Sequence, residues 1–324
     1  MTSLAVTSSS TTWWRSAQLI GVGLTVALLA GLMAAPETAT RLLWDGAIPL
    51  LPAVFLVHPG IWRNVCPLAT LNMLPNRKGT GRGLNDRLVP VAGAIGIMLL
   101  ALLVPARRFL FNHDGTALAL TIAGVAVLAV ALGMVFDQKA GFCSGICPVL
   151  PVERLYGQDP LITVGNPRCN PCTTCVTRGC IDLAQSKSLA QVLGRSRKSH
   201  AWLQGHYGIF AASFPGFVAG YYLTPDGPLS SAGSVYLTVG LGAVVSYGIT
   251  QAVVRLSGIS AVGAIRLLGA IALGIYYWFA AEVVSTHLAL APWAPYAIRA
   301  AAFTLILWWL GRFDWRGTSL AVSH

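Results

Sequence analysis

Long apolar stretches alternate with shorter polar ones along most of this chain. A helix that crosses a bilayer needs roughly 20 mostly apolar residues. Eight stretches approach that length, and they cover approximately residues 17–35, 43–61, 88–106, 117–136, 203–223, 233–254, 259–281 and 295–311. The pattern predicts an all-α integral membrane protein with about eight transmembrane helices. The first stretch lacks a clear small-residue cleavage site, so we expect a retained helix and not a signal peptide.

Two longer polar segments interrupt the apolar pattern, and every other connection is short. Residues 62–87 form the first segment, and residues 137–202 form the second. We therefore expect three parts: helices one to four with the first loop in residues 1–136, a small extramembrane part in residues 137–202, and helices five to eight in residues 203–324. The two polar segments are where we expect the chemistry.

Composition supports the membrane assignment and argues against nucleic acid as a partner. The 324 residues are 55% hydrophobic and only 10% charged, with a mean hydropathy of +0.66, which excludes an ordinary soluble domain. The net charge is +11, but the basic residues lie in short loops between apolar stretches. This arrangement is typical of membrane topology, so we expect no nucleic-acid partner.

The distribution of Lys and Arg predicts the orientation, because cytoplasmic loops hold the excess of positive charge. With the amino terminus inside, most of the 22 basic residues fall on the cytoplasmic side, and only Arg41, Arg107 and Arg108 fall on the other. We therefore expect a multi-pass protein with both termini in the cytoplasm. All seven cysteines then lie on the cytoplasmic side, where thiols stay reduced and metal ligation is favoured over disulfides.

Four of the cysteines lie in the run RCNPCTTCVTRGC. Cys169, Cys172 and Cys175 follow one another at two-residue gaps, so a tight loop can wrap three thiolates around one cluster. The run is similar to the bacterial ferredoxin pattern C-x2-C-x2-C-x3-C-P. It departs from that pattern because Cys180 comes one residue late and is followed by Ile181.

The three cysteines at two-residue gaps need a further cluster ligand from elsewhere in the chain. We expect two Cys-Pro pairs to supply it. Cys66 and Cys147 each precede a proline near the cytoplasmic end of an expected helix. Aligning them places HPGIWRNVCPLATLNML (residues 58–74) against KAGFCSGICPVLPVERL (residues 139–155), which indicates an internal repeat.

The repeat bears on the number of clusters. Cys143 lies four residues before Cys147, whereas Trp62 stands at the equivalent place before Cys66. A complete duplication would supply thiolates for two [4Fe–4S] clusters, and this chain is one short. We expect one or two iron–sulfur clusters, at least one of them [4Fe–4S], with the second a three-cysteine [3Fe–4S] or [4Fe–4S] site. The alternative is a single cluster on the ferredoxin-type run and one Cys-Pro cysteine.

Membrane helices that end in Cys-Pro loops, followed by a ferredoxin-type run, resemble the membrane-bound polyferredoxins. These include the membrane ferredoxins that accompany periplasmic nitrate reductase and nitrous oxide reductase. The resemblance covers roughly residues 45–185 and implies a ferredoxin-like iron–sulfur segment at 137–202. It also implies a bacterial cytoplasmic membrane protein that transfers single electrons through [4Fe–4S] clusters between the quinone pool and a partner redox protein.

Zinc is the alternative use of these cysteines, because four thiolates suffice for a structural zinc site. Zinc sites usually pair two separated C-x2-C elements, and seven thiolates exceed the need of one ion. The iron–sulfur hypothesis is therefore favoured over zinc. Some thiols, Cys66 or Cys180 in particular, could instead serve only in packing.

Candidate residues for chemistry inside the membrane are few. His58 and His206 lie near cytoplasmic helix ends, where they could protonate a quinone or ligate haem, although packing explains such histidines as well. Arg266 lies about two turns inside helix seven, facing a cofactor, a quinone or backbone carbonyls, or else snorkelling to headgroups. A quinone is left open, haem is not expected, and no catalytic residue is assigned.

A basic, glycine-rich loop lies next to Cys66. Its charges are Arg63, Arg77, Lys78, Arg82 and Arg87. The simplest interpretation is the positive-inside rule. The functional alternative is a docking surface for an acidic cytoplasmic carrier such as ferredoxin or flavodoxin.

The main hypothesis is electron transfer between a cytoplasmic carrier and the quinone pool or a membrane redox partner, as a carrier or as a quinone-linked oxidoreductase subunit. The alternative is a transporter or assembly factor whose cluster senses redox state or iron. The number of helices, large for a simple anchor, keeps this alternative open.

Overall fold

The fold is all-helical. The computed structural model describes residues 8–75, 81–161, 185–194 and 200–312. Within those ranges the regular elements are helices, and the one strand-like contact is an isolated bridge between Arg82 and Phe136. The expected all-α class is confirmed.

Helices long and apolar enough to cross a membrane account for most of the expected spans. Among the described residues there are seven: Trp13–Ala34, Pro36–Val57, Leu88–Phe111, Gly115–Val135, Leu229–Ser257, Ala261–His287 and Ala294–Gly311. The expected fifth helix is present as α10 (His206–Leu223) but is not one of the seven. Its tyrosines, its glycines and Pro215 lower its hydropathy relative to the others.

Proline determines where the second expected span breaks. The chain runs through a π-helical segment, η1 (Leu42–Ala47), and α3 (Ile48–Val57), and then restarts as α4 (Pro59–Val65). His58 between them is extended, with φ −166° and ψ 105°, because a residue that precedes proline is disfavoured in the helical region. The expected loop at 62–87 is wrong at its start, since α4 and α5 (Pro67–Met73) occupy most of residues 62–73, with a non-helical break at Cys66.

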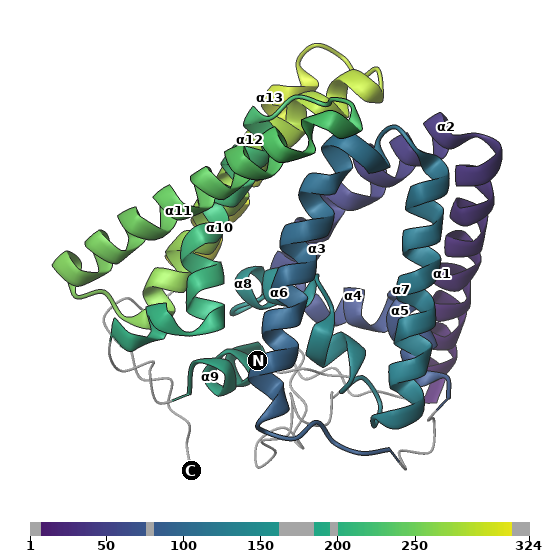
Figure 1. The fold of residues 1–324 in the computed structure, drawn as a ribbon, viewed down its shortest axis with the longest axis horizontal. Helices are drawn as coiled ribbons and strands as arrows, with labels where there is room; N and C mark the ends of the chain where they lie inside the picture. Colours follow the sequence, from purple (N-terminus) through teal and green to yellow (C-terminus); the bar gives the residue numbers. More distant parts are fainter. Residues whose placement is uncertain (1–7, 76–80, 162–184, 195–199, 313–324) are drawn as a thin grey trace. The chain divides into compact units, whose positions relative to one another are not determined.

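The chain divides into two compact units. The first comprises Met1–Thr40, Ala53–Leu100 and Asp114–Gln191. In it α7 (Gly115–Val135) packs against α1 (Ser8–Ala34) and α5 (Figure 1). The α5–α7 contact depends on Gly133, because a Cβ there would overlap the carbonyl oxygen of Asn72.

The second unit comprises Arg41–Pro52, Ala101–His113 and Val192–His324. Here α10 packs against α11 (Ala232–Ser257) and α12 (Ala261–His287), and α12 packs against α13 (Ala294–Gly311) (Figure 1). Large apolar side chains on α11, including Leu241, Val244 and Ile249, are exposed, as lipid-facing residues would be.

Candidate functional site

The two Cys-Pro elements have the same local geometry. Cys66 ends α4 with φ −56° and ψ 124°, and Cys147 ends the π-helical segment η3 (Phe142–Ile146) with φ −59° and ψ 124°. Each cysteine precedes a proline, which favours this extended conformation. A short helix follows each of them, α5 in the first case and α8 (Leu150–Tyr156) in the second. The backbone therefore repeats where the sequence repeats.

Three cysteines from the two Cys-Pro elements share one packing cluster in the first unit. Cys143 is buried with Ala69, Ala129 and Phe142, and Cys66 and Cys147 pack against the same group. All three are free thiols. We call these three residues the thiol cluster.

The thiols are close enough to influence one another's ionisation. Burial raises the pKa of Cys143 to about 12, and a thiolate at Cys66 would raise it further. Burial also raises the pKa of Cys147, to which Cys143 and Cys66 add. Without a bound cation or metal these cysteines are therefore neutral thiols at neutral pH.

Charged side chains are buried beside the thiol cluster. The Arg63 guanidinium forms an ion pair with Glu153 (NH1 to Oε2, 3.3 Å) and donates from NH2 to Ser144 Oγ at 3.0 Å. Lys139 Nζ donates to the Arg63 carbonyl oxygen at 2.6 Å. Lys139 is 0% exposed, Glu153 3% and Arg63 4%. We call Arg63, Lys139 and Glu153 the charged triad.

The charged triad places a surplus of positive charge at the thiols. Lys139 and Arg63 oppose the rise in the pKa of Cys143, whereas Glu153 adds to it. Burial and the Arg63 charge lower the pKa of Lys139 to about 8, and thiolates at Cys143 and Cys66 act in the other direction. The charged triad thus sets two buried cations and one carboxylate beside the three thiols.

In the described parts of the chain, no group of three or more His, Cys, Asp or Glu side chains is arranged to hold a metal ion. The three thiols of the thiol cluster are nevertheless of the donor type that an iron–sulfur cluster or a zinc ion uses.

The ferredoxin-type run, with Cys169, Cys172, Cys175 and Cys180, lies outside the described residues. The chain on each side of it is attached to the first unit. Before it, the Leu161 amide donates to the Leu56 carbonyl oxygen at 3.0 Å. After it, Ser188 of α9 (Gln185–Leu193) accepts from Arg154 Nε of α8 at 2.8 Å. Both flanks are thus anchored on the unit that contains the thiol cluster.

The other candidate residues that the sequence offered lie in different units of the structure. His58 belongs to the first unit, where its ring lies against Gly60. His206 is the first residue of α10 and belongs to the second unit. Arg266, also in the second unit, is 2% exposed, lies 4.5 Å from the Trp309 ring and donates to the Trp309 carbonyl oxygen. Arg266 is therefore buried against a backbone carbonyl and an aromatic ring.

Sequence reasoning missed the charged triad. Arg63 was expected in an exposed basic stretch, and this is wrong because Arg63 is buried in α4. Arg82 and Arg87 are exposed, and Arg77 and Lys78 lie outside the described residues. The repeat held a usable signal: Arg63 and Ser144, which bond each other, occupy equivalent positions in the two copies.

A second polar group lies in the second unit. The Asp45 carboxylate is bonded by His287 Nδ1 at 2.6 Å and by Arg107 NH2 at 3.4 Å. Arg107 also stacks over the Trp44 ring at 4.7 Å. Arg107 belongs to a second π-helical segment, η2 (Arg107–Phe111).

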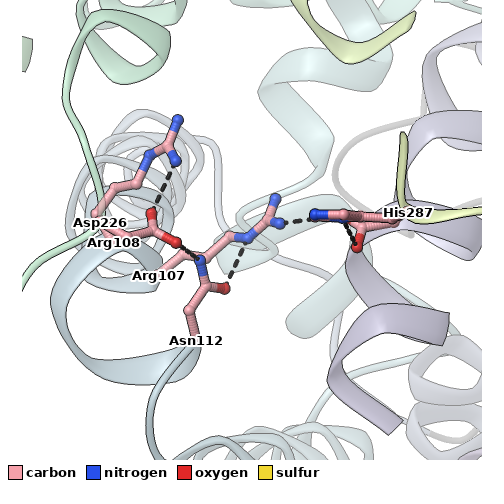
Figure 2. A network of polar contacts seen from close by, with 6 residues as sticks. Arg107, Arg108, Asn112, Asp226 and His287 are labelled. Carbon is pink, nitrogen blue, oxygen red and sulfur yellow. Dashed lines mark hydrogen bonds and ion pairs between the residues drawn. The ribbon is translucent and has the colours of Figure 1, made fainter. Parts of the chain in front are cut away.

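The same group continues beyond Arg107, as Figure 2 shows. Arg107 Nε donates to Asn112 Oδ1 at 3.0 Å, and Asn112 Nδ2 donates to Asp226 Oδ2 at 2.8 Å. Arg108 NH1 pairs with Asp226 Oδ1 at 2.8 Å. Sequence reasoning placed Arg107 and Arg108 in one loop but gave no sign of these partners. We call this chain of residues the polar network.

Comparison of the chain with protein-family models, curated proteins and solved structures finds no match. The resemblance to the membrane polyferredoxins therefore remains a hypothesis based on the cysteine pattern.

Proposed function

We propose that this protein is a membrane-bound iron–sulfur electron carrier. It would pass single electrons between a cytoplasmic carrier of the ferredoxin or flavodoxin class and the quinone pool or a partner membrane subunit. The observation that supports this most strongly is the burial of three thiols from two Cys-Pro elements beside two cations and one carboxylate. That combination suits a thiolate-bound anion and has no evident use in an empty protein core.

Each part of the site has a role in this proposal. Cys66, Cys143 and Cys147 bind iron as thiolates, together with cysteines of the ferredoxin-type run. When bound, the cluster stores one electron at a time. Phe142 and Ala129 pack at the thiol cluster and exclude water from it. The ion pair of Arg63 with Glu153 links α4 to α8 and so holds the two Cys-Pro elements together.

Each transfer would move one electron from a reduced carrier, by way of the cysteine-bound cluster, to the acceptor. A partner subunit would accept single electrons, whereas a quinone would need two such transfers and two protons from water to become a quinol. Exposed Arg82 and Arg87 provide positive charge for an acidic carrier to approach. In this proposal the thiol cluster and both termini face the cytoplasm.

The deciding experiment is chemical analysis of protein purified without oxygen. We expect iron with acid-labile sulfide, and an absorption shoulder from thiolate-to-iron charge transfer. Cys143→Ser and Cys172→Ala should each lose at least one cluster, whereas Gly124→Ala, at a position in α7 with open space at its Cβ, should retain its iron. Zinc without sulfide would refute the proposal.

The same samples test the number of clusters. About seven or eight irons per chain with two distinct paramagnetic signals support two clusters, and about four with one signal support a single [4Fe–4S] cluster. Orientation has its own test, since an impermeant thiol reagent outside intact cells should not label Cys172 of the metal-free protein. Ready labelling would reverse the proposed orientation.

A further inference from the structure

We propose that Lys139 and Arg63 are positioning residues that raise the reduction potential of the cluster at Cys66, Cys143 and Cys147. This inference rests on the proposed function, because it concerns the cluster that the proposal places there. It adds a role for residues that bind no iron.

Both cations are held in place. Lys139 Nζ is fixed by its 2.6 Å bond to the Arg63 carbonyl oxygen, and the Arg63 guanidinium is fixed by Ser144 and Glu153. Neither side chain reaches solvent. Their charges therefore cannot turn away from the thiol cluster, and water does not screen them.

Both cations lie beside the thiol cluster. The Arg63 guanidinium donates to Ser144, the residue next to Cys143, and Lys139 is bonded to the backbone of Arg63, three residues before Cys66. A buried charge is costly unless it is paired, so an anionic cluster bound at these thiols would be stabilised by both cations.

Reduction of the cluster adds one negative charge at this place. A fixed positive charge stabilises the reduced form more than the oxidised form, and the effect is large where water is absent. The potential of an iron–sulfur cluster responds to net charge and solvent exposure. Lys139 and Arg63 should therefore raise the potential, and Glu153 should lower it.

The test is a redox titration of the purified protein, followed by paramagnetic resonance. Lys139→Met, which removes the charge at similar side-chain length, should lower the potential by at least about 59 mV, a tenfold change in a one-electron equilibrium. Glu153→Gln, which removes the charge but keeps the side-chain shape and one acceptor oxygen for Arg63, should raise it. A merely structural role of these residues would not shift the reduction potential in opposite directions in the two variants.

Arg154→Gln is the matched control. Arg154 is as buried as the triad, at 2% exposed, but its guanidinium bonds Ser188 of α9. We expect a smaller shift from it than from Lys139→Met. An equal shift would mean that the potential responds to any loss of buried charge, and the assignment to the triad would fail.

Further outcomes separate this inference from the proposed function. Wild-type protein without iron would overturn the proposed function itself. Full iron content in Lys139→Met with an unchanged potential, or shifts of the same sign in both variants, would overturn only the role of the triad. If Lys139→Met fails to fold, two variants still test the inference. Arg63→Lys, which keeps the charge, should retain the wild-type potential. Glu153→Gln should still shift the potential upwards.

Discussion

The charged triad and the polar network both combine cationic side chains with carboxylates, but in different proportions. The triad has two cations and one carboxylate, all almost fully buried next to thiols. The polar network pairs Arg107 and Arg108 with Asp45 and Asp226, so its fixed charges balance. Its outer members are also partly open, with the side chains of Asp226 and His287 41% and 46% exposed.

The difference shows what each group is suited to do. Balanced pairs at helix ends satisfy one another, and the polar network thereby joins η1, η2, the α10–α11 connection and the end of α12. The triad instead lies beside three thiols, which is where the proposed function places an anionic cluster. The comparison predicts that the triad should be the more sensitive of the two to mutation.

Breaking the triad should have the largest effect on stability. Arg63→Met leaves Glu153 buried without its guanidinium partner, and loss of one partner of a buried pair costs about 3–5 kcal/mol. Chemical unfolding of metal-free protein in mixed micelles measures this loss, with Arg63→Lys as the control that keeps the charge. A loss below about 1 kcal/mol would show that the pair is not buried as described.

The buried carboxylate of the polar network should come next. Asp45→Asn removes the charge that both Arg107 and His287 contact, and a hydrogen bond to a charged group contributes about 1.5–3 kcal/mol. The same unfolding measurement applies. Iron content and reduction potential should stay at wild-type values, and a change in either would contradict the separation of the two groups.

Close packing in the first unit gives a prediction with a control in the same helix. Gly133→Ala places a methyl group against the Asn72 carbonyl, and overpacking of this kind costs about 1–3 kcal/mol. Gly124, also in α7, has open space at its Cβ, so Gly124→Ala should be neutral or stabilising. Equal effects in the two variants would mean that α5 does not pack closely on α7.

The smallest effect should come from the exposed end of the polar network. Asp226→Asn removes the carboxylate that pairs with Arg108, and pairs open to solvent contribute about 0.2–1 kcal/mol. High salt should reduce the difference between this variant and the wild type, because exposed charges are screened. A loss as large as that of Asp45→Asn would show that the network acts as one unit.

Sequence predicted the parts of this protein that depend on local rules. Apolar length fixes where helices can cross a bilayer, and proline fixes the extended conformation at Cys66 and Cys147. The fifth expected span, residues 203–223, falls on α10, where tyrosines and Pro215 make composition an ambiguous guide. The repeat around the Cys-Pro pairs was also visible, because it needs only a comparison of residues 58–74 with 139–155.

Only the tertiary structure revealed which charges are buried and what they contact. A positive residue beside a membrane helix predicts an exposed cytoplasmic loop on statistical grounds, yet Arg63 is enclosed by Ser144 and Glu153, which are far from it in sequence. Asp45 and His287 are likewise distant in sequence and meet when η1 packs against α12. Hydropathy and turn rules act over a few residues, whereas burial depends on which distant segments fold together.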